Sequence, residues 1–158
     1  MNIVDAQFKN LPDETLQGSD VFGGKRVVVF GLPGAFTPTC SSKQLPRFDE
    51  LYNEFTEYVD EVYCVSVNDG FVMKAWFENL GIENIKYLSD GSGVFTKAMG
   101  MLVAKDNLGF GFRSWRYAVV LNDGNVERMF AEEGFCDNCE TDPYEVSTPE
   151  NVLEFLKS

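Results

Sequence analysis

Residues 25–42, KRVVVFGLPGAFTPTCSS, join a short β-branched run to a loop rich in glycine and proline. The apolar run is typical of a buried strand. After the loop, Thr37 suits the N-cap position of a helix and Pro38 suits its first turn. The stretch therefore predicts a strand, a loop and a helix in succession, with Cys40 in the first helical turn.

The helix that follows is predicted by one apolar stripe, formed by Leu45, Phe48, Leu51, Tyr52 and Phe55. Pro46 falls inside this stripe, where proline removes a backbone hydrogen bond and crowds the preceding turn. Because the stripe continues past Pro46, we expect a kinked helix rather than a break.

Strands and helices alternate along the rest of the chain. Residues 1–24 suggest an N-terminal hairpin, and residues 116–130 predict another hairpin that turns at Asp123 and Gly124. Further strands are expected at residues 60–67 and 84–90, and helices at 70–81, 93–100 and from Thr148 onward. The pattern predicts an α/β sandwich in one domain, residues 1–158.

The chain carries 13 basic and 25 acidic residues, which gives a net charge of -12. Such a charge repels phosphate backbones and anionic lipid, so we expect no nucleic acid and no membrane partner. No secretory signal or membrane-spanning run is found, which favours a cytoplasmic protein. Its four cysteines, Cys40, Cys64, Cys136 and Cys139, are interpreted first as free thiols, with redox or metal roles as alternatives.

The chain contains no histidine. A Cys-His or Ser-His catalytic pair and histidine-ligated metals are therefore excluded, and neither a metal nor a cofactor is expected. At a helix N-terminus, Cys40 would meet unpaired backbone N–H groups and the positive end of the helix dipole, which favour a thiolate. The alternative is that Cys40 is a small buried apolar residue.

The segment PGAFTPTC resembles the active-site pattern of peroxiredoxins, with Pro33, Thr37 and Cys40 in register. VFGLPGAFTPTCS, SVNDGFVMKAW and RSWRYAVVLNDG are all similar to one branch of that family, which contains the animal type V and plant type II enzymes. The likeness extends from about residue 20 to the C-terminus. It implies a thioredoxin-like fold with a central mixed sheet flanked by helices.

The resemblance implies that Cys40 attacks a peroxide and becomes a sulfenic acid. Pro33 would shield Cys40 from solvent, and the Thr37 hydroxyl would hydrogen-bond the thiolate and the peroxide. Arg116 would stabilise the thiolate and orient the substrate, as a guanidinium with several fixed donors can. Without the resemblance, Arg116 would be interpreted as half of a surface salt bridge.

Two cysteines are candidates for the resolving thiol that reduces the sulfenic acid. Cys139 lies near the position of the resolving cysteine of animal type V enzymes, although its acidic neighbours disfavour a thiolate. Cys64 lies near the position suggested for plant type II enzymes, but in an apolar strand that favours a structural role. Cys136 and Cys139 form Cys-x-x-Cys in an acidic loop, where a disulfide or no pairing is expected and zinc is not.

We expect an external thiol, either glutathione with glutaredoxin or thioredoxin, to reduce Cys40 directly, with Cys139 as the second choice. The predicted function is therefore a thiol peroxidase acting on hydrogen peroxide and small organic hydroperoxides in antioxidant defence. The alternatives are a non-catalytic peroxide sensor and a thioredoxin-like redox module. Relatives in this branch also imply a homodimer, formed through the face that carries Phe36.

Overall fold

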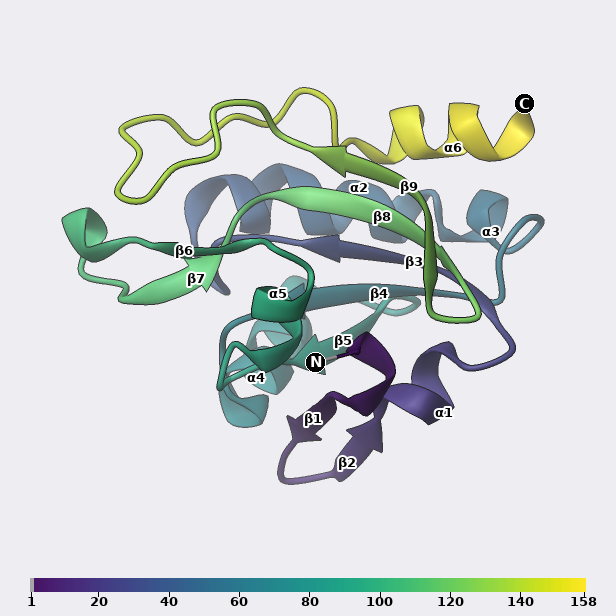
Figure 1. The fold of residues 1–158 in the computed structure, drawn as a ribbon, viewed down its shortest axis with the longest axis horizontal. Helices are drawn as coiled ribbons and strands as arrows, with labels where there is room; N and C mark the ends of the chain where they lie inside the picture. The colour runs from purple at the N-terminus through teal and green to yellow at the C-terminus, as the bar shows by residue number, and fades with distance from the viewer. Residues whose placement is uncertain (1) are drawn as a thin grey trace.

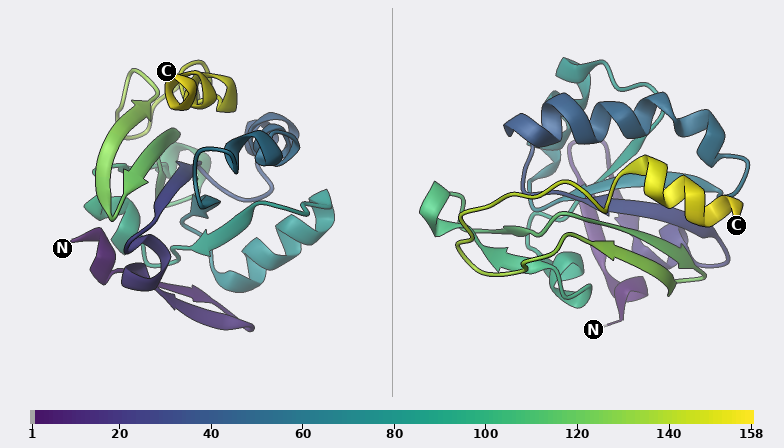
Figure 2. Two further views of the ribbon diagram at one scale, coloured as in Figure 1. Left: turned by 90° about the vertical axis from the view of Figure 1, so that its right-hand side faces the viewer. Right: turned by 90° about the horizontal axis from the view of Figure 1, so that it is seen from above.

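The computed structural model describes residues 2–158. A five-stranded mixed sheet has the strand order β5-β4-β3-β8-β9 and lies between two layers of helices and short segments (Figures 1 and 2). Its strands are β3 (Arg26–Gly31), β4 (Glu61–Ser66), β5 (Lys86–Ser89), β8 (Tyr117–Asn122) and β9 (Asn125–Ala131). β3, β4 and β5 are parallel, whereas β8 runs antiparallel to both β3 and β9.

Side chains of β3 alternate between two apolar cores, as the pleat of a strand requires. Val28 and Phe30 face one core, whereas Val27 and Val29 face the other. The first core is covered by α2 (Leu45–Glu50), α3 (Tyr52–Phe55), α4 (Gly70–Leu80) and α6 (Pro149–Lys157). The second core is covered by η1 (Ile3–Asp5), α1 (Gly18–Phe22) and α5 (Val94–Ala98), together with the start of the chain.

The predicted N-terminal hairpin is present, apart from Met1, which lies outside the described residues. It pairs β1 (Gln7–Asn10) with β2 (Glu14–Gln17). The turn at Asp123 and Gly124 is also present, and both residues have positive φ, as the tight turn of a hairpin requires. The predicted helix ends are present too: Gly81 is left-handed at the end of α4, and Thr148 accepts from the Asn151 N–H at the start of α6.

One hairpin is missing from the sequence-based prediction. β6 (Leu102–Ala104) pairs with β7 (Phe112–Ser114), and the short helix η3 (Asp106–Leu108) lies between them. Each strand has only three residues, which is too short for an alternating pattern to be recognised. This hairpin projects from one end of the molecule, beyond the central sheet (Figure 1).

The helix after β3 begins at Pro38, as predicted from Thr37. The helix continues through Pro46 rather than breaking there, and it contains a π segment, η2 (Cys40–Gln44), which leads directly into α2. The Leu45 N–H donates to the Cys40 carbonyl, five residues back. Pro46 has no N–H to donate, so the widened turn accommodates it without ending the helix.

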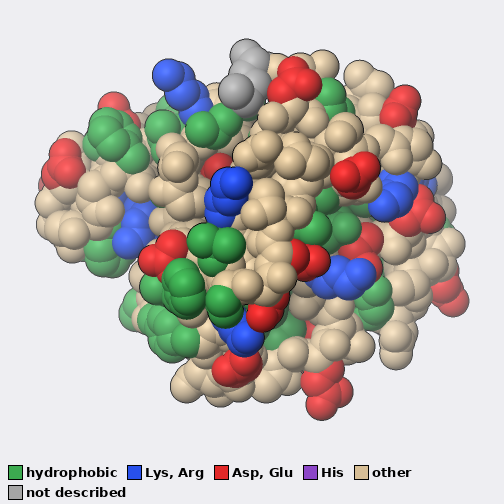
Figure 3. Space-filling view, turned by 90° about the horizontal axis from the view of Figure 1, so that it is seen from below, with side chains coloured by type: hydrophobic (Ala, Val, Ile, Leu, Met, Phe, Trp, Pro, Cys, Tyr) green, Lys and Arg blue, Asp and Glu red, His purple; other side chains and the backbone are tan. Residues whose placement is uncertain are grey.

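Acidic side chains are spread over the face seen from below, with fewer basic side chains between them (Figure 3). This distribution agrees with the net charge of -12. Across residues 2–158, none of the helices combines the length and apolarity needed to cross a bilayer.

Candidate active site

Cys40 is fully buried at the start of the helix that follows β3. It packs in the first core together with Phe30, Leu45 and Phe48. It has no disulfide partner. The position follows from the local sequence, since the strand end, the loop and the helix that begins at Pro38 bring this sulfur to the edge of the core.

Arg116 lies immediately before β8 and is 1% exposed. Its Nη2 donates to Cys40 Sγ at 3.3 Å, across 76 positions of sequence. The antiparallel pairing of β3 with β8 explains this contact, because it places Tyr117 beside Gly31, where β3 runs into the Cys40 loop. A permanent cation thus faces the sulfur inside the protein.

Three further residues accept hydrogen bonds from the Arg116 guanidinium. Nε donates to Gln44 Oε1 at 2.8 Å, and Nη1 donates to Asp142 Oδ1 at 2.6 Å and to the Pro143 carbonyl at 3.1 Å. Burial by itself would lower the pKa of Arg116, but the nearby Cys40 and Asp142 outweigh it and raise that pKa. Arg116 therefore remains a cation in the folded protein.

The loop between β3 and Cys40 is fastened to its neighbours. The Ala35 N–H donates to Asn68 Oδ1 at 3.0 Å, and Arg113 Nη1 donates to the Pro33 carbonyl at 3.1 Å. Pro33 is buried, whereas Phe36 is 54% exposed and has a φ of 64°. Such a backbone conformation is unusual for a bulky residue and indicates that the surrounding contacts fix the loop.

The Thr37 hydroxyl donates to the Gly34 carbonyl at 2.7 Å. Its single hydrogen is therefore directed at the loop rather than at the Cys40 sulfur in this structure. The hydroxyl oxygen keeps lone pairs that can accept a hydrogen bond.

Arg113 is a second cation near Cys40, to which the sequence analysis assigned no role. Burial lowers the pKa of Arg113, while the negative charge of Cys40 opposes that shift. A side chain at Gly34 would collide with this guanidinium, so the two segments are in close contact.

Cys64 is fully buried in β4 and belongs to the same core as Cys40. Burial raises the pKa of the Cys64 thiol well above its usual value, and Cys40 raises it further. Cys64 is thus held as a neutral thiol.

Cys136 and Cys139 form a disulfide, so the interpretation of all four cysteines as free thiols is wrong for these two. Their Cα atoms lie 5.5 Å apart, within the range that a disulfide spans. Cys139 packs against Trp115 and Val103 in a small cluster of its own, separate from the core around Cys40.

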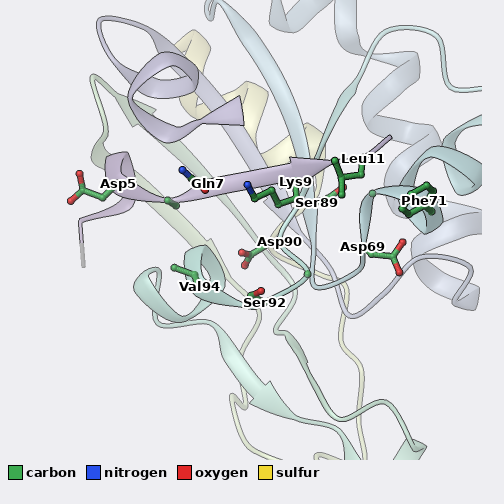
Figure 4. A pocket seen from close by; sticks show the side chains of 13 residues that line it. Asp5, Gln7, Lys9, Leu11, Asp69, Phe71, Ser89, Asp90, Ser92 and Val94 are labelled. Atoms are coloured by element: carbon green, nitrogen blue, oxygen red, sulfur yellow. The ribbon is translucent and has the colours of Figure 1, made fainter. Parts of the chain in front are cut away.

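A pocket of about 580 Å³ lies elsewhere, between β1 and the segment that leads into α5. Gln7 and Lys9 lie along its β1 side, whereas Asp90, Ser92 and Val94 lie across from them (Figure 4). Neither Cys40 nor Arg116 lines it. The reactive sulfur is therefore not placed in this pocket.

Sequence reasoning missed Gln44, Asp142 and Arg113 as parts of the site. Gln44 follows Cys40 by one turn, a spacing that could have indicated it. Nothing in the local sequence signals Asp142, because a loop of irregular structure brings it to Arg116.

The family model described as Redoxin matches residues 3–142. Peroxiredoxin y4vD of Sinorhizobium fredii is 64% identical over 140 residues, which cover 88% of this chain and 74% of that protein. Peroxiredoxin-2B of Arabidopsis thaliana is 39% identical over 145 residues, which cover 90% of this chain and 85% of that protein.

Among solved structures, the antioxidant protein of Plasmodium falciparum, described as a 1-Cys peroxiredoxin, superposes with a TM-score of 0.88. It is 40% identical, and the match covers 94% of this chain and 89% of that chain. The Redoxin match to residues 3–142 includes every strand of the central sheet as well as Cys40 and Arg116.

Proposed function

The chain belongs to the peroxiredoxins of the Redoxin family, which are thiol-dependent peroxidases, and on this premise we propose that it reduces hydrogen peroxide and small organic hydroperoxides with an external thiol as reductant. The observation that carries the proposal is the 3.3 Å contact between Arg116 Nη2 and Cys40 Sγ. Antioxidant defence in the cytoplasm is the corresponding role. The chain is similar both to bacterial and to plant type II peroxiredoxins.

The first step is an attack of the Cys40 thiolate on one oxygen of the peroxide. The S–O bond forms as the O–O bond breaks, sulfur is oxidised to sulfenic acid, and the departing oxygen takes a proton to leave as water or an alcohol. As negative charge shifts from sulfur to the departing oxygen, the Arg116 N–H groups donate hydrogen bonds to the atoms that carry it. This lowers the activation barrier for cleavage of the O–O bond. The Thr37 hydroxyl oxygen accepts a hydrogen bond from the peroxide, and Pro33 shields the Cys40 sulfur from bulk water.

The second step returns Cys40 to the thiol. A first external thiol attacks the sulfenic acid, forms a mixed disulfide and releases water, and a second thiol releases Cys40 as it forms a disulfide with the first. Glutathione with glutaredoxin, or thioredoxin, supplies these thiols. The burial of Cys64 and the pairing of Cys139 with Cys136 both favour an external reductant. The description of the Plasmodium falciparum neighbour as a 1-Cys enzyme agrees with it.

A homodimer through the face around Phe36 is part of the proposal. Phe36, Phe71 and Phe112 are 54%, 60% and 65% exposed. The contacts from Asn68 to Ala35 and from Arg113 to Pro33 bring the three segments that carry these rings to one end of the molecule. Exposed aromatic side chains gathered in this way are typical of an interface.

The test follows peroxide consumption by the wild type and by Cys40→Ser, Cys64→Ser and Cys139→Ser. Each protein is supplied first with glutathione and glutaredoxin and then with thioredoxin and its reductase. We expect background turnover for Cys40→Ser, because the nucleophile is gone, and near wild-type turnover for the other two. Mass spectrometry after one equivalent of peroxide should place a single added oxygen on Cys40.

Two outcomes contradict the proposal in different ways. If Cys40 in the wild type reacted with peroxide no faster than free cysteine, the peroxidase function would be wrong. If Cys139→Ser oxidised normally but failed to turn over with every reductant, Cys139 would be the resolving cysteine and the direct external reduction of Cys40 would be wrong.

A further inference from the structure

The Arg116 guanidinium has all five N–H groups engaged. Nε donates to Gln44, Nη1 to Asp142 and Pro143, and Nη2 to Cys40 and to Asp142 Oδ2 at 3.1 Å. Asp142 thus takes one hydrogen from each terminal nitrogen in a two-pronged ion pair. The Arg116 guanidinium cannot rotate out of its plane without breaking this ion pair.

The ion pair between Arg116 and Asp142 determines the direction of the N–H group that faces the Cys40 sulfur. Because the guanidinium is flat, two bonds to one carboxylate fix its plane, and the second N–H of Nη2 then points at Cys40 Sγ. Gln44 fixes the opposite edge and is itself held by the Gly31 carbonyl, to which its Nε2 donates at 3.3 Å. Asp142 is therefore one of two side chains that set the direction of the catalytic donor.

Asp142 also brings a negative charge close to the thiolate. The Asp142 side chain is 49% exposed, whereas Arg116 is 1% exposed, so the carboxylate closes the guanidinium off from solvent on one side. Its charge partly neutralises Arg116 and so opposes the stabilisation of the Cys40 thiolate. The position of Asp142 therefore favours the reaction of Cys40, whereas its charge disfavours the thiolate. Mutation can separate these two effects.

The segment that carries Asp142 is fastened on both sides. Before Asp142, Asn107 Nδ2 donates to the Cys139 carbonyl at 3.2 Å, and after it the buried Glu132 carboxylate accepts from the N–H groups of Glu145 and Ser147, both at 2.8 Å. The Pro143 carbonyl adds a further bond to Arg116 at 3.1 Å. A loop without helix or strand can therefore hold Asp142 in a fixed place.

We propose that Asp142 is a positioning residue of the peroxidase reaction, which orients the Arg116 guanidinium so that Nη2 donates to Cys40 and to the peroxide that attacks it. The longer of the two prongs, from Nη2 to Oδ2 at 3.1 Å, is the one that a peroxide oxygen can replace. The shorter prong, to Nη1, holds Arg116 while this happens. The inference rests on the proposed peroxidase function.

The experiment measures the second-order rate of Cys40 oxidation by hydrogen peroxide, as a function of pH, in Asp142→Asn, Asp142→Ala and Asp142→Glu. Asp142→Ala should lower the maximal rate about 10²-fold, the scale of a misplaced catalytic group. Asp142→Asn keeps one acceptor and should lose about 10-fold, equivalent to one charge-assisted hydrogen bond. Asp142→Glu should recover part of the loss, since it restores the carboxylate.

The pH profile distinguishes positioning from simple stabilisation of the fold. Removing the negative charge in Asp142→Asn favours the thiolate, so the rise of the rate with pH should move to lower pH even though the maximal rate falls. A purely structural role would lower the melting temperature and leave the profile of the folded protein in place. Glu140→Gln, an exposed acid in the same segment, is the matched control and should change neither quantity.

Two results would overturn the inference. One is a set of Asp142 variants with wild-type rates and profiles. The other is a loss of rate with no shift in pH dependence and no recovery in Asp142→Glu. A slow wild type would instead overturn the proposed function, so the two failures are distinguishable. If Asp142→Ala does not fold, Asp142→Asn and Asp142→Glu give the same decision.

Discussion

Two of the regions that carry cysteines differ in almost every respect. Cys40 lies at the junction of a buried strand and a helix, is fully buried and has no disulfide partner. Cys136 and Cys139 lie on a loop without helix or strand and are paired with each other. The spacing of cysteines in the sequence therefore says less about their chemistry than the elements that surround them.

Arg116 joins the two regions. Its Nη2 contacts Cys40 on one side, and both terminal nitrogens contact Asp142, three residues after Cys139, on the other. The junction of strand and helix supplies the nucleophile, Cys40. The loop supplies Asp142, the group that orients Arg116.

The largest effect is expected from Arg116→Lys. Lysine keeps the charge but cannot donate to Cys40, Gln44 and Asp142 together, so both regions lose their link. The rate of Cys40 oxidation should fall about 10²–10³-fold, as when a transition-state donor is removed. Stopped-flow measurement of the peroxide reaction checks this, with the exposed Arg128→Lys as control. A rate within a factor of two of the wild type would contradict the role of the guanidinium.

A smaller effect is expected from Glu132→Gln, which alters only the loop region. The buried Glu132 carboxylate accepts from three backbone N–H groups and from the Ser147 hydroxyl at 2.6 Å. An amide replaces one acceptor oxygen by a donor, so the free energy of unfolding should fall by about 2 kcal/mol. Urea denaturation measures it, and the exposed Glu133→Gln should leave it unchanged. Equal stability of the two variants would show that the loop is not fastened through Glu132.

The smallest effect concerns Cys64, which shares a core with Cys40 but not its reactivity. The thiolate is the form that is alkylated, and burial raises the pKa of Cys64 well above its usual value, with a further contribution from Cys40. Iodoacetamide at pH 8 should therefore label Cys40 and leave Cys64 unmodified until the protein unfolds. Peptide mass spectrometry checks this. Cys40→Ser removes the contribution of Cys40 to the raised pKa of Cys64, so it should slightly increase Cys64 labelling at high pH. Fast labelling of Cys64 in the wild type would contradict its buried, neutral state.

Much of the fold was predictable because it follows from local patterns. The strand at β3, the helix ends at Gly81 and Thr148 and the turn at Asp123 each depend on a few neighbouring residues. The thioredoxin-like fold implied by the resemblance is confirmed, with a central mixed sheet of five strands between helices. Where the pattern was too short, as in β6 and β7, or where a helix adapted to Pro46 through a π segment, prediction from the sequence was incomplete.

The sequence by itself determined that Cys40 lies in the first turn of a helix after a buried strand and that no histidine is available to activate it. Only the tertiary structure decided how the helix accommodates Pro46, which groups fix Arg116 and that the Thr37 hydroxyl donates to Gly34. The physical reason is the distance along the sequence over which each interaction acts. Caps, turns and apolar stripes act over a few residues, whereas the bonds of Arg116 to Cys40 and Gln44 span more than 70 positions and exist only once the sheet has formed.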